Sequence, residues 1–221
     1  MEKTRATVRF EWKLNVKGYQ WAADGTVLQD SQATPFDLRA TQPLEKEPGL
    51  FRTFAGLNGK DTKALRGFAN RFGLLRSDSA GSEPLRDWEE VIGQMHCAVS
   101  AWDTLTRVQK GEPFTEDPKA VHQRLVHALD APLKQVSMGM VANDDGSSAI
   151  AYTPRDLLSA LWLQFAIAVT EGKDLQPCER KGCDRWMEIT HSKGGTRSTR
   201  RFCSHACRMR FVRDEKKKEE S

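Results

Sequence analysis

The chain has 221 residues, of which 38% are hydrophobic and 29% are charged, and this length suffices for one mid-sized domain or a domain with a small appendage. The N-terminal residues are polar and alternating, unlike the continuous apolar run of a signal peptide. The longest apolar stretch, residues 157–169, is interrupted by Ser159 and Gln164 and is too short to span a bilayer. These features predict a soluble, cytoplasmic protein without a membrane partner.

The formal net charge of +4 is unevenly distributed along the chain. Residues 176–221 contain thirteen Lys and Arg against seven Asp and Glu, which gives this segment a charge of +6 and leaves −2 on the rest. The same segment holds four of the five cysteines. The basic charge therefore coincides with the cysteine-rich end of the chain.

The first predicted elements are β-strands. Residues 4–28 alternate apolar and polar side chains around turn residues at Gly18 and Gly25, a pattern that predicts a small antiparallel meander. The next stretch, residues 30–49, contains three prolines and little periodicity. We therefore expect a loop there.

Three amphipathic helices are predicted next. The first begins at Asp61, a residue type favoured at N-caps, and ends at Gly73. The second is opened by residues 82–84 and carries apolar side chains every three or four positions as far as residues 110–111. A third is expected from residue 117 or 118 to residue 130.

A hairpin and a core helix follow. Residues 135–141 and 149–152 alternate on either side of the Asn-Asp-Asp-Gly turn at 143–146, which predicts a β-hairpin. Thr153-Pro154 is expected to cap the most apolar helix, residues 155–170, which ends at Gly172. This helix should be central. We expect it to bury the face that carries Leu161, Trp162 and Phe165. The 84–110 helix should likewise bury the face that carries Trp88, Met95 and Trp102.

These elements together predict an α+β fold in three parts. Residues 1–175 form a mainly helical body with small antiparallel β elements near its start. Residues 176–213 form a four-cysteine zinc module, built from a knuckle and a helix. The charged tail, residues 214–221, is expected to be a frayed helix end or disordered.

Four cysteines near the C-terminus form two close pairs: Cys178 with Cys183, and Cys203 with Cys207. Tetrahedral thiolate coordination suits such pairs, because each pair closes a local chelate while the intervening segment folds over the metal. Gly182 permits a tight turn in the first pair. The i, i+4 spacing of the second pair places both sulfurs on one face of a helix that begins at Ser204. The spacing predicts one structural Zn²⁺ bound by four thiolates.

Two other interpretations of the cysteines stay open. They can be buried or redox-active thiols, although the chain has no C-x-x-C motif. Alternatively, His191 between the pairs or His205 within the second pair replaces one cysteine as a ligand. The fifth cysteine, Cys97, lies in the middle of the 84–110 helix and is most simply a core residue.

The residues around the cysteines resemble a known family. The runs Cys178-Glu-Arg-Lys-Gly-Cys183-Asp-Arg-Trp-Met and Arg200-Arg-Phe-Cys-Ser-His-Ala-Cys-Arg-Met-Arg210 are similar to the C-terminal zinc finger of the bacterial CGNR proteins. That family joins the finger to a mostly helical N-terminal domain and is regarded as a group of transcription regulators. The resemblance therefore implies zinc and a DNA-binding role. The chain departs from the family signature, since Cys207 is followed by Arg-Met-Arg in place of Gly-Asn-Arg and the last cysteine pair is one residue closer.

Basic side chains occupy the loop between the cysteine pairs and the helix after them. The loop, residues 191–201, mixes Lys and Arg with hydroxyl side chains, and the helix carries Arg and Lys at i, i+3 and i+7 from position 210. Lys and Arg neutralise phosphates, and Ser and Thr donate hydrogen bonds to them. We therefore expect duplex DNA to contact Lys193, Arg197, Arg200, Arg201, Arg210 and Arg213.

The predicted function is DNA binding in a bacterial transcription regulator whose N-terminal body senses a ligand or mediates oligomerisation. The alternative is a protein-interaction adaptor, antitoxin-like or defence-associated, that presents the zinc module to a protein partner. The sequence leaves the oligomeric state open. An enzyme is not expected, because a site closed by four thiolates has no open position for a substrate water, and the chain has neither a Gly-rich phosphate loop nor an H-E-x-x-H motif.

Overall fold

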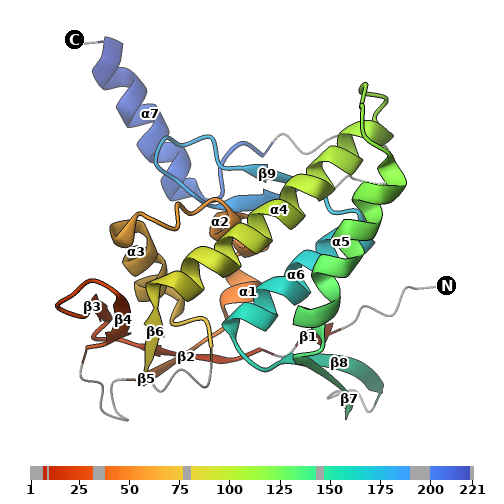
Figure 1. Ribbon diagram of the computed structural model, residues 1–221. Helices are drawn as coiled ribbons and strands as arrows, with labels where there is room; N and C mark the ends of the chain where they lie inside the picture. The colour runs from red at the N-terminus through yellow and green to blue at the C-terminus, as the bar shows by residue number, and fades with distance from the viewer. Residues whose placement is uncertain are drawn as a thin grey trace.

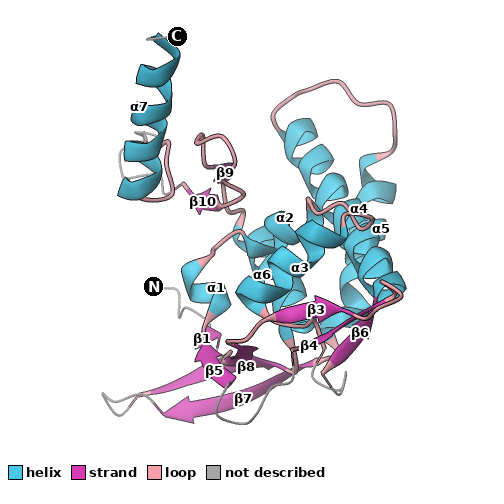
Figure 2. Cartoon of the chain, turned by 90° about the vertical axis from the view of Figure 1, so that its left-hand side faces the viewer, coloured by secondary structure: helices cyan, strands magenta, loops and turns pink. Residues whose placement is uncertain are grey.

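The computed structural model describes residues 7–8, 10–31, 38–76, 81–142, 147–189 and 200–219, and it shows an α+β protein. A helical body occupies the centre of the molecule (Figure 1). Small sheets lie at one end of this body, and the cysteine-rich segment with helix α7 lies at the opposite end (Figures 1 and 2). The predicted fold class is therefore confirmed.

The body is built around α6 (Leu157–Glu171), which packs against α1 (Pro43–Lys46), α2 (Leu50–Ala55) and α5 (Pro118–Leu133). The long helix α4 (Leu85–Gln109) covers α2 and α5. Both predicted apolar faces are buried, as are the side chains of α2 and α3 (Thr62–Phe72) that complete the core. Aromatic rings meet at its centre: Phe51, Phe54, Phe68, Trp88, Trp102 and Phe165.

The predicted helices are confirmed, and local hydrogen bonds define their ends. Asp61 caps α3 by accepting hydrogen bonds from the N–H groups of Lys63 and Ala64, each at 3.0 Å. The predicted cap of α6 is wrong, because Asp156 takes that place. Its carboxylate accepts the N–H of Ser159 at 2.8 Å, and the Ser159 hydroxyl accepts the N–H of Asp156 at 3.0 Å.

Two helices occupy sequence that was not predicted to be helical. Helix α1 lies in the segment expected to be a loop, and α2 follows it directly. Five of the six α2 residues are buried, so this short helix has no polar face and no helical periodicity in its sequence. Its pattern of burial explains why the sequence did not reveal it.

The strands of residues 12–30 fall into two small sheets instead of one consecutive meander. As predicted, β3 (Tyr19–Trp21) pairs antiparallel with β4 (Val27–Asp30), and β6 (Ser82–Pro84) extends that sheet. The strand β2 (Trp12–Asn15) pairs with β5 (Leu38–Thr41), which lies in the predicted loop. The meander is wrong at β2 because the N–H of Tyr19 donates to the Asn70 side chain of α3, 2.8 Å away, so β3 begins against a helix.

The predicted hairpin is confirmed. Strands β7 (Val136–Ala142) and β8 (Ser148–Pro154) pair antiparallel over seven register positions. The predicted turn residues 143–146 lie outside the described residues. A short strand, β1 (Thr7–Val8), pairs parallel with β8 and gives the sheet order β1-β8-β7.

The C-terminal segment begins with β9 (Leu175–Pro177), which pairs antiparallel with β10 (Trp186–Glu188). Helix α7 (His205–Glu219) then extends away from the body (Figure 2). The helix is continuous through residue 213 and into the segment predicted to be a charged tail. Among the described residues, no helix combines the length and the apolar character needed to cross a membrane.

Candidate metal centre

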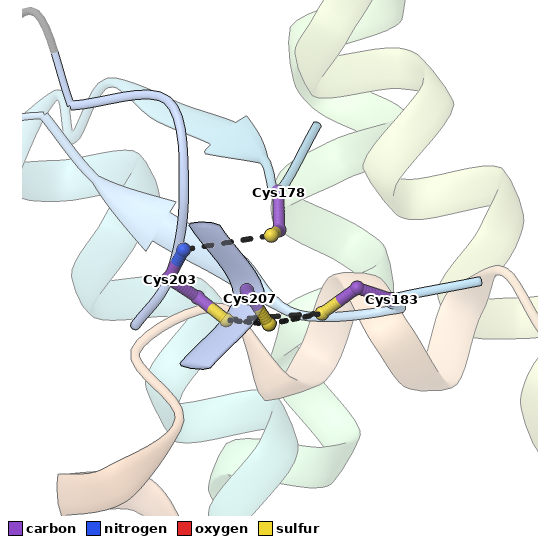
Figure 3. Close-up of side chains that lie close together, drawn as sticks. All are labelled: Cys178, Cys183, Cys203 and Cys207. Carbon is purple, nitrogen blue, oxygen red and sulfur yellow. Dashed lines mark hydrogen bonds between the residues drawn. The ribbon is translucent and has the colours of Figure 1, made fainter. Parts of the chain in front are cut away.

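The four predicted ligands converge on one point from three pieces of chain (Figure 3). Cys178 directly follows β9, Cys183 lies in the turn between β9 and β10, and the second pair stands at the start of α7. The Sγ atom of Cys203 lies 3.7 Å from that of Cys183 and 3.3 Å from that of Cys207. All four sulfurs lie within 4.8 Å of one another.

These distances fit a tetrahedral metal site. A zinc ion bound to sulfur at about 2.3 Å places its ligand sulfurs about 3.8 Å apart, and the Sγ atoms of Cys183 and Cys207 are 3.8 Å apart. The donor set consists of sulfur alone, which suits a borderline or soft cation. The cluster can therefore hold a metal ion.

Backbone hydrogen bonds shape the first cysteine pair into a knuckle. The N–H of Cys178 donates to the carbonyl of Arg185 at 2.9 Å, and the N–H of Cys183 donates to the carbonyl of Arg180 at 3.0 Å. Gly182 has a φ of 73°, a conformation that glycine adopts without strain. The N–H of Cys203 donates to the Cys178 sulfur, 3.5 Å away, so a hydrogen bond joins the second cysteine pair to the first.

The second pair is positioned by the N-terminus of α7. Ser204 acts as its cap, because the Ser204 hydroxyl accepts the N–H of Cys207 at 3.2 Å and the Ser204 carbonyl accepts the N–H of Arg208 at 3.2 Å. The predicted helix start at Ser204 is thus confirmed. The positive end of the helix dipole lies beside the thiols and favours their ionised form.

The thiols influence one another's ionisation. Burial raises the pKa of Cys203 to about 12, and the neighbouring thiols add to this rise. At Cys207 burial also acts to raise the pKa, but hydrogen bonds from Ser204, Cys203 and Arg180 outweigh it and lower the pKa to about 6. Several thiolates in contact repel one another unless a cation neutralises them, so the cluster is suited to a divalent metal.

The alternative ligands and the fifth cysteine are placed differently from the cluster. His205 is exposed and lies outside the group of four converging side chains, and His191 lies outside the described residues. Cys97 is exposed, so its prediction as a core residue is wrong. It faces a hollow between α4 and α5 and not the apolar face of α4.

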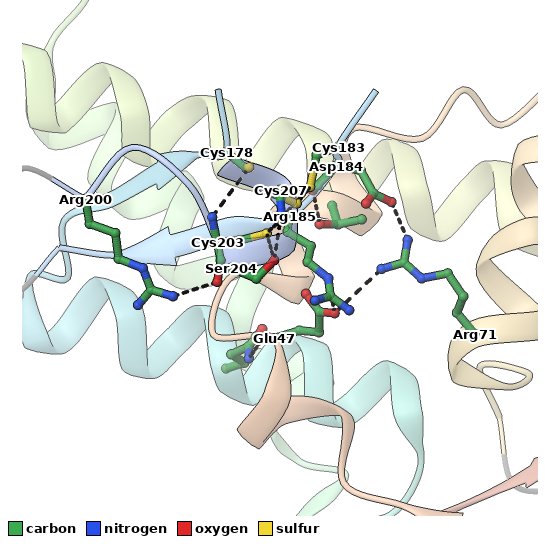
Figure 4. Close-up of polar contacts among 12 residues, drawn as sticks. Glu47, Arg71, Cys178, Cys183, Asp184, Arg185, Arg200, Cys203, Ser204 and Cys207 are labelled. Carbon is green, nitrogen blue, oxygen red and sulfur yellow. Dashed lines mark hydrogen bonds and ion pairs between the residues drawn. The ribbon is translucent and has the colours of Figure 1, made fainter. Parts of the chain in front are cut away.

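Polar contacts hold the knuckle against the helical body (Figure 4). The guanidinium of Arg185 lies 2.8 Å from the buried carboxylate of Glu47, and Arg71 of α3 lies 2.6 Å from the Asp184 carboxylate. The Thr53 hydroxyl donates to the Asp184 carbonyl at 2.7 Å. The two residues that follow Cys183 are therefore both fixed to the body.

An aromatic contact completes this junction. Trp186 lies against Gly49, where an added Cβ would be only 2.4 Å from the Trp186 Cβ, and its ring packs 4.8 Å from the guanidinium of Arg52. The sequence did not identify the docking residues of the body. A glycine directly before the buried segment of α2 was the one available signal of close approach.

The six residues predicted to contact DNA are placed in three ways. Lys193 and Arg197 lie outside the described residues, whereas Arg210 and Arg213 are exposed on α7. Arg200 donates to the carbonyls of Phe202 and Cys203, at 3.1 and 2.6 Å. Arg201 donates to the Glu179 carboxylate at 2.7 Å and lies over the rings of Phe202 and Phe211.

A basic hollow of about 460 Å³ lies beside the start of α7. Its lining combines three arginines with a histidine, a serine and an aromatic ring: Arg200, Arg201, Phe202, Ser204, His205 and Arg208. Arg208 and His205 were not among the predicted contacts.

Comparison of the chain with protein-family models, curated proteins and solved structures found no match.

Proposed function

We propose that Cys178, Cys183, Cys203 and Cys207 bind one structural zinc ion. All-sulfur donation and near-tetrahedral spacing support zinc, the metal for which closed four-cysteine sites are typical. A preformed hydrogen bond between the two cysteine pairs and a capped helix supports a structural role. With four thiolate ligands, the ion has no open position for a substrate, so the site serves binding and not catalysis.

We further propose that the zinc module binds duplex DNA. The observation that carries this proposal is helix α7, which extends from the body (Figure 2). Its sequence places basic side chains directly after the second cysteine pair. Arg208, Arg210 and Arg213 are all exposed. The major groove admits an α-helix, and an exposed helix that extends from the body has the shape to enter it.

The exposed arc of α7 also fits the chemistry of a major groove. At 100° per residue, Met209 lies at the centre of the arc opposite Cys207 and Phe211. Val212 lies to one side of it, and Arg208, Arg210 and Arg213 occupy the rest of the arc. Apolar side chains can contact thymine methyl groups while flanking arginines bind phosphates or guanine edges. The basic hollow at the start of α7 extends this surface to Arg200 and Arg201.

The resemblance of the cysteine region to the CGNR zinc finger supports the same function, and a bacterial transcription regulator is the role it implies. In this proposal Arg200 and Arg201 each have two roles. Their contacts with backbone carbonyls and Glu179 shape the module, and their exposed surfaces line the basic hollow.

A salt titration tests the proposal. Zinc-loaded full-length protein should bind duplex DNA with an affinity that falls steeply as salt rises. Five phosphate contacts, from Lys193, Arg197, Arg208, Arg210 and Arg213, correspond to a slope of log affinity against log salt of about −4 to −5. Removing the metal should abolish binding. Failure of the intact zinc-loaded protein to bind at low salt would refute the DNA proposal.

A protein-interaction adaptor is the second candidate, and one observation favours it. Met209 and Val212 are among the large apolar side chains that remain exposed, at 50% and 42%. Exposed apolar residues on one helix face are typical of helices that bind a groove on a protein partner. The double variant Met209→Ala/Val212→Ala separates the candidates. It should leave the salt slope on DNA unchanged if the arginines bind phosphate, whereas loss of a salt-insensitive protein complex would favour the adaptor.

A further inference from the structure

The hairpin at the opposite end of the molecule from α7 presents an unpaired sheet edge. Strand β7 is the terminal strand in the order β1-β8-β7, and its outer edge has no strand partner among the described residues. All seven of its residues pair with β8 without a bulge. The edge therefore offers a straight row of backbone N–H and C=O groups. Another β-strand can form hydrogen bonds with all of them.

This edge lacks the features that usually prevent strand addition. The sequence of β7, VSMGMVA, contains no charged residue and no proline. Exposed edge strands are commonly protected by lysine, proline, a bulge or an inward-pointing charge. None of the four is present in β7, so its edge is open to strand addition.

The outward face of the hairpin is apolar. Met138 is 69% exposed, Met140 is 78% exposed and Ile150 is 50% exposed. Met140 is paired with Ile150 and Met138 with Tyr152, so these side chains share one face of the sheet. The opposite face carries Ala151, which is buried against the body. An occupant of the edge therefore gains apolar contacts on the outward face.

We propose that the occupant is β7 of a second copy of this chain, paired antiparallel about a two-fold axis at Gly139. Gly139 is the central residue of the seven, so this register matches the whole strand with itself. Met138 of each copy then lies opposite Met140 of the other, on one face and without an unpaired charge.

The proposed dimer leaves the zinc module accessible, because α7 and β7 lie at opposite ends of the molecule in both views (Figures 1 and 2). Seven paired residues span about 24 Å. A contact of that length buries less than the roughly 1,200 Å² of stable complexes, so the dimer should be weak and should form as the concentration rises.

Sedimentation velocity of the full-length protein from about 5 to about 200 µM tests the pairing. Wild type should shift from monomer to dimer over this range. The variant Met138→Lys/Met140→Lys places like charges directly opposite one another and should remain monomeric. The variant Met138→Lys/Met140→Glu places opposite charges across the same pairs and should restore the dimer. Only the proposed register predicts that restoration.

A control with the same added charge is Ser148→Lys/Thr153→Lys, which alters exposed positions of the inner strand β8 and should still dimerise. Zinc content and denaturation midpoint show whether each variant is folded. A wild type that stays monomeric throughout would overturn the proposal. A dimer that survives the double lysine variant, or a charge-swapped variant that stays monomeric, would also overturn it.

Discussion

The Nε atom of Arg185 lies 2.8 Å from the Glu47 carboxylate, and this pair joins the cysteine knuckle to the helical body. Glu47 is 5% exposed, and Arg71 approaches the same carboxylate oxygen at 3.6 Å. Burial raises the pKa of Glu47, and the two guanidinium groups offset part of that rise. Since Arg185 follows Cys183 by two residues, the pair couples the position of a metal ligand to the body.

Replacing Glu47 by Ala should weaken this junction. The change leaves the guanidinium of Arg185 beside a buried site without its carboxylate, which should lower the free energy of unfolding by about 1–3 kcal/mol. The lower part of that range reflects the partial exposure of both arginines. Glu45→Ala, an exposed change two residues earlier, is the control and should cost less than about 0.5 kcal/mol. Equal costs for the two variants in urea unfolding would contradict the role given to Glu47.

The metal site gives a second prediction. The purified protein should contain one zinc per chain with sulfur ligands only, and Cys203→Ser should lose the metal and unfold the segment from β9 to α7 while the helical body stays folded. Cys97→Ser is the matched control, because Cys97 lies outside the cluster, and it should keep its zinc. Elemental analysis and X-ray absorption measure both. A nitrogen ligand in the absorption spectrum would instead support coordination by histidine.

The core gives a third prediction. Trp162 of α6 is 2% exposed and its ring lies 6.1 Å from that of Phe165. Trp162→Ala removes a large buried side chain and should lower the free energy of unfolding by about 3–5 kcal/mol. Val126→Ala, at a 54% exposed position of α5, should change it by less than about 0.5 kcal/mol. A Trp162 variant with a wild-type denaturation midpoint would disprove the packing argument.

Glu83 should make stability depend on pH. Its side chain is buried in β6 and accepts the N–H groups of Leu75 at 3.0 Å and Arg76 at 2.6 Å. Burial raises its pKa from 4.5 to about 7, although these hydrogen bonds act to lower it. Between these two pH values the native state binds more protons than the unfolded state, so stability falls as the pH rises.

The expected contribution of Glu83 is fully present below pH 4.5 and is lost as the pH rises through about 7. The shift corresponds to about 3 kcal/mol between the two limits. Urea unfolding at pH 5 and pH 8 measures it, with Glu83→Gln as the reference, since glutamine cannot titrate. The free energy of unfolding of wild type, relative to that of the variant, should be lower at pH 8 than at pH 5. A difference that is independent of pH would show that Glu83 is ionised throughout.

Periodic patterns were enough to predict the amphipathic helices and the hairpin of this fold. Helices α3, α4 and α5 each present an apolar stripe, and β7 and β8 alternate around a turn sequence. The same reasoning failed for α2, because a short helix with nearly every residue buried has no period to detect. It also failed for the partner of β2, since β5 lies in a proline-containing segment with little periodicity, which predicted a loop.

The sequence predicted some residues of the candidate site and missed others. Cysteine spacing identified the four converging side chains, because chelating pairs are local in sequence. The docking residues were not identified, since Glu47, Arg71 and Arg185 meet only after the body has folded. Contacts of Arg200 with a backbone carbonyl and of Arg201 with the Glu179 carboxylate were not predicted either, because these groups meet only in the folded module.

The last prediction separates the structural arginines from those that the DNA proposal needs. Arg210 and Arg213 are exposed on α7, whereas Arg201 lies against Glu179 and over the rings of Phe202 and Phe211. If each helix arginine contacts one phosphate, Arg210→Ala/Arg213→Ala should reduce the slope of log affinity against log salt by about two, with zinc content unchanged.

Arg201→Ala should behave differently, because it removes the contact between Glu179 and the segment before Cys203. We expect this variant to lose zinc to a competing chelator faster than wild type, and to change the salt slope by at most about one. The measurements are a salt titration on duplex DNA and a chelator-competition assay on the same preparations. An unchanged slope in the Arg210 and Arg213 double variant would remove α7 from the DNA proposal. Its exposed Met209 and Val212 would then be better explained as a surface for a protein partner.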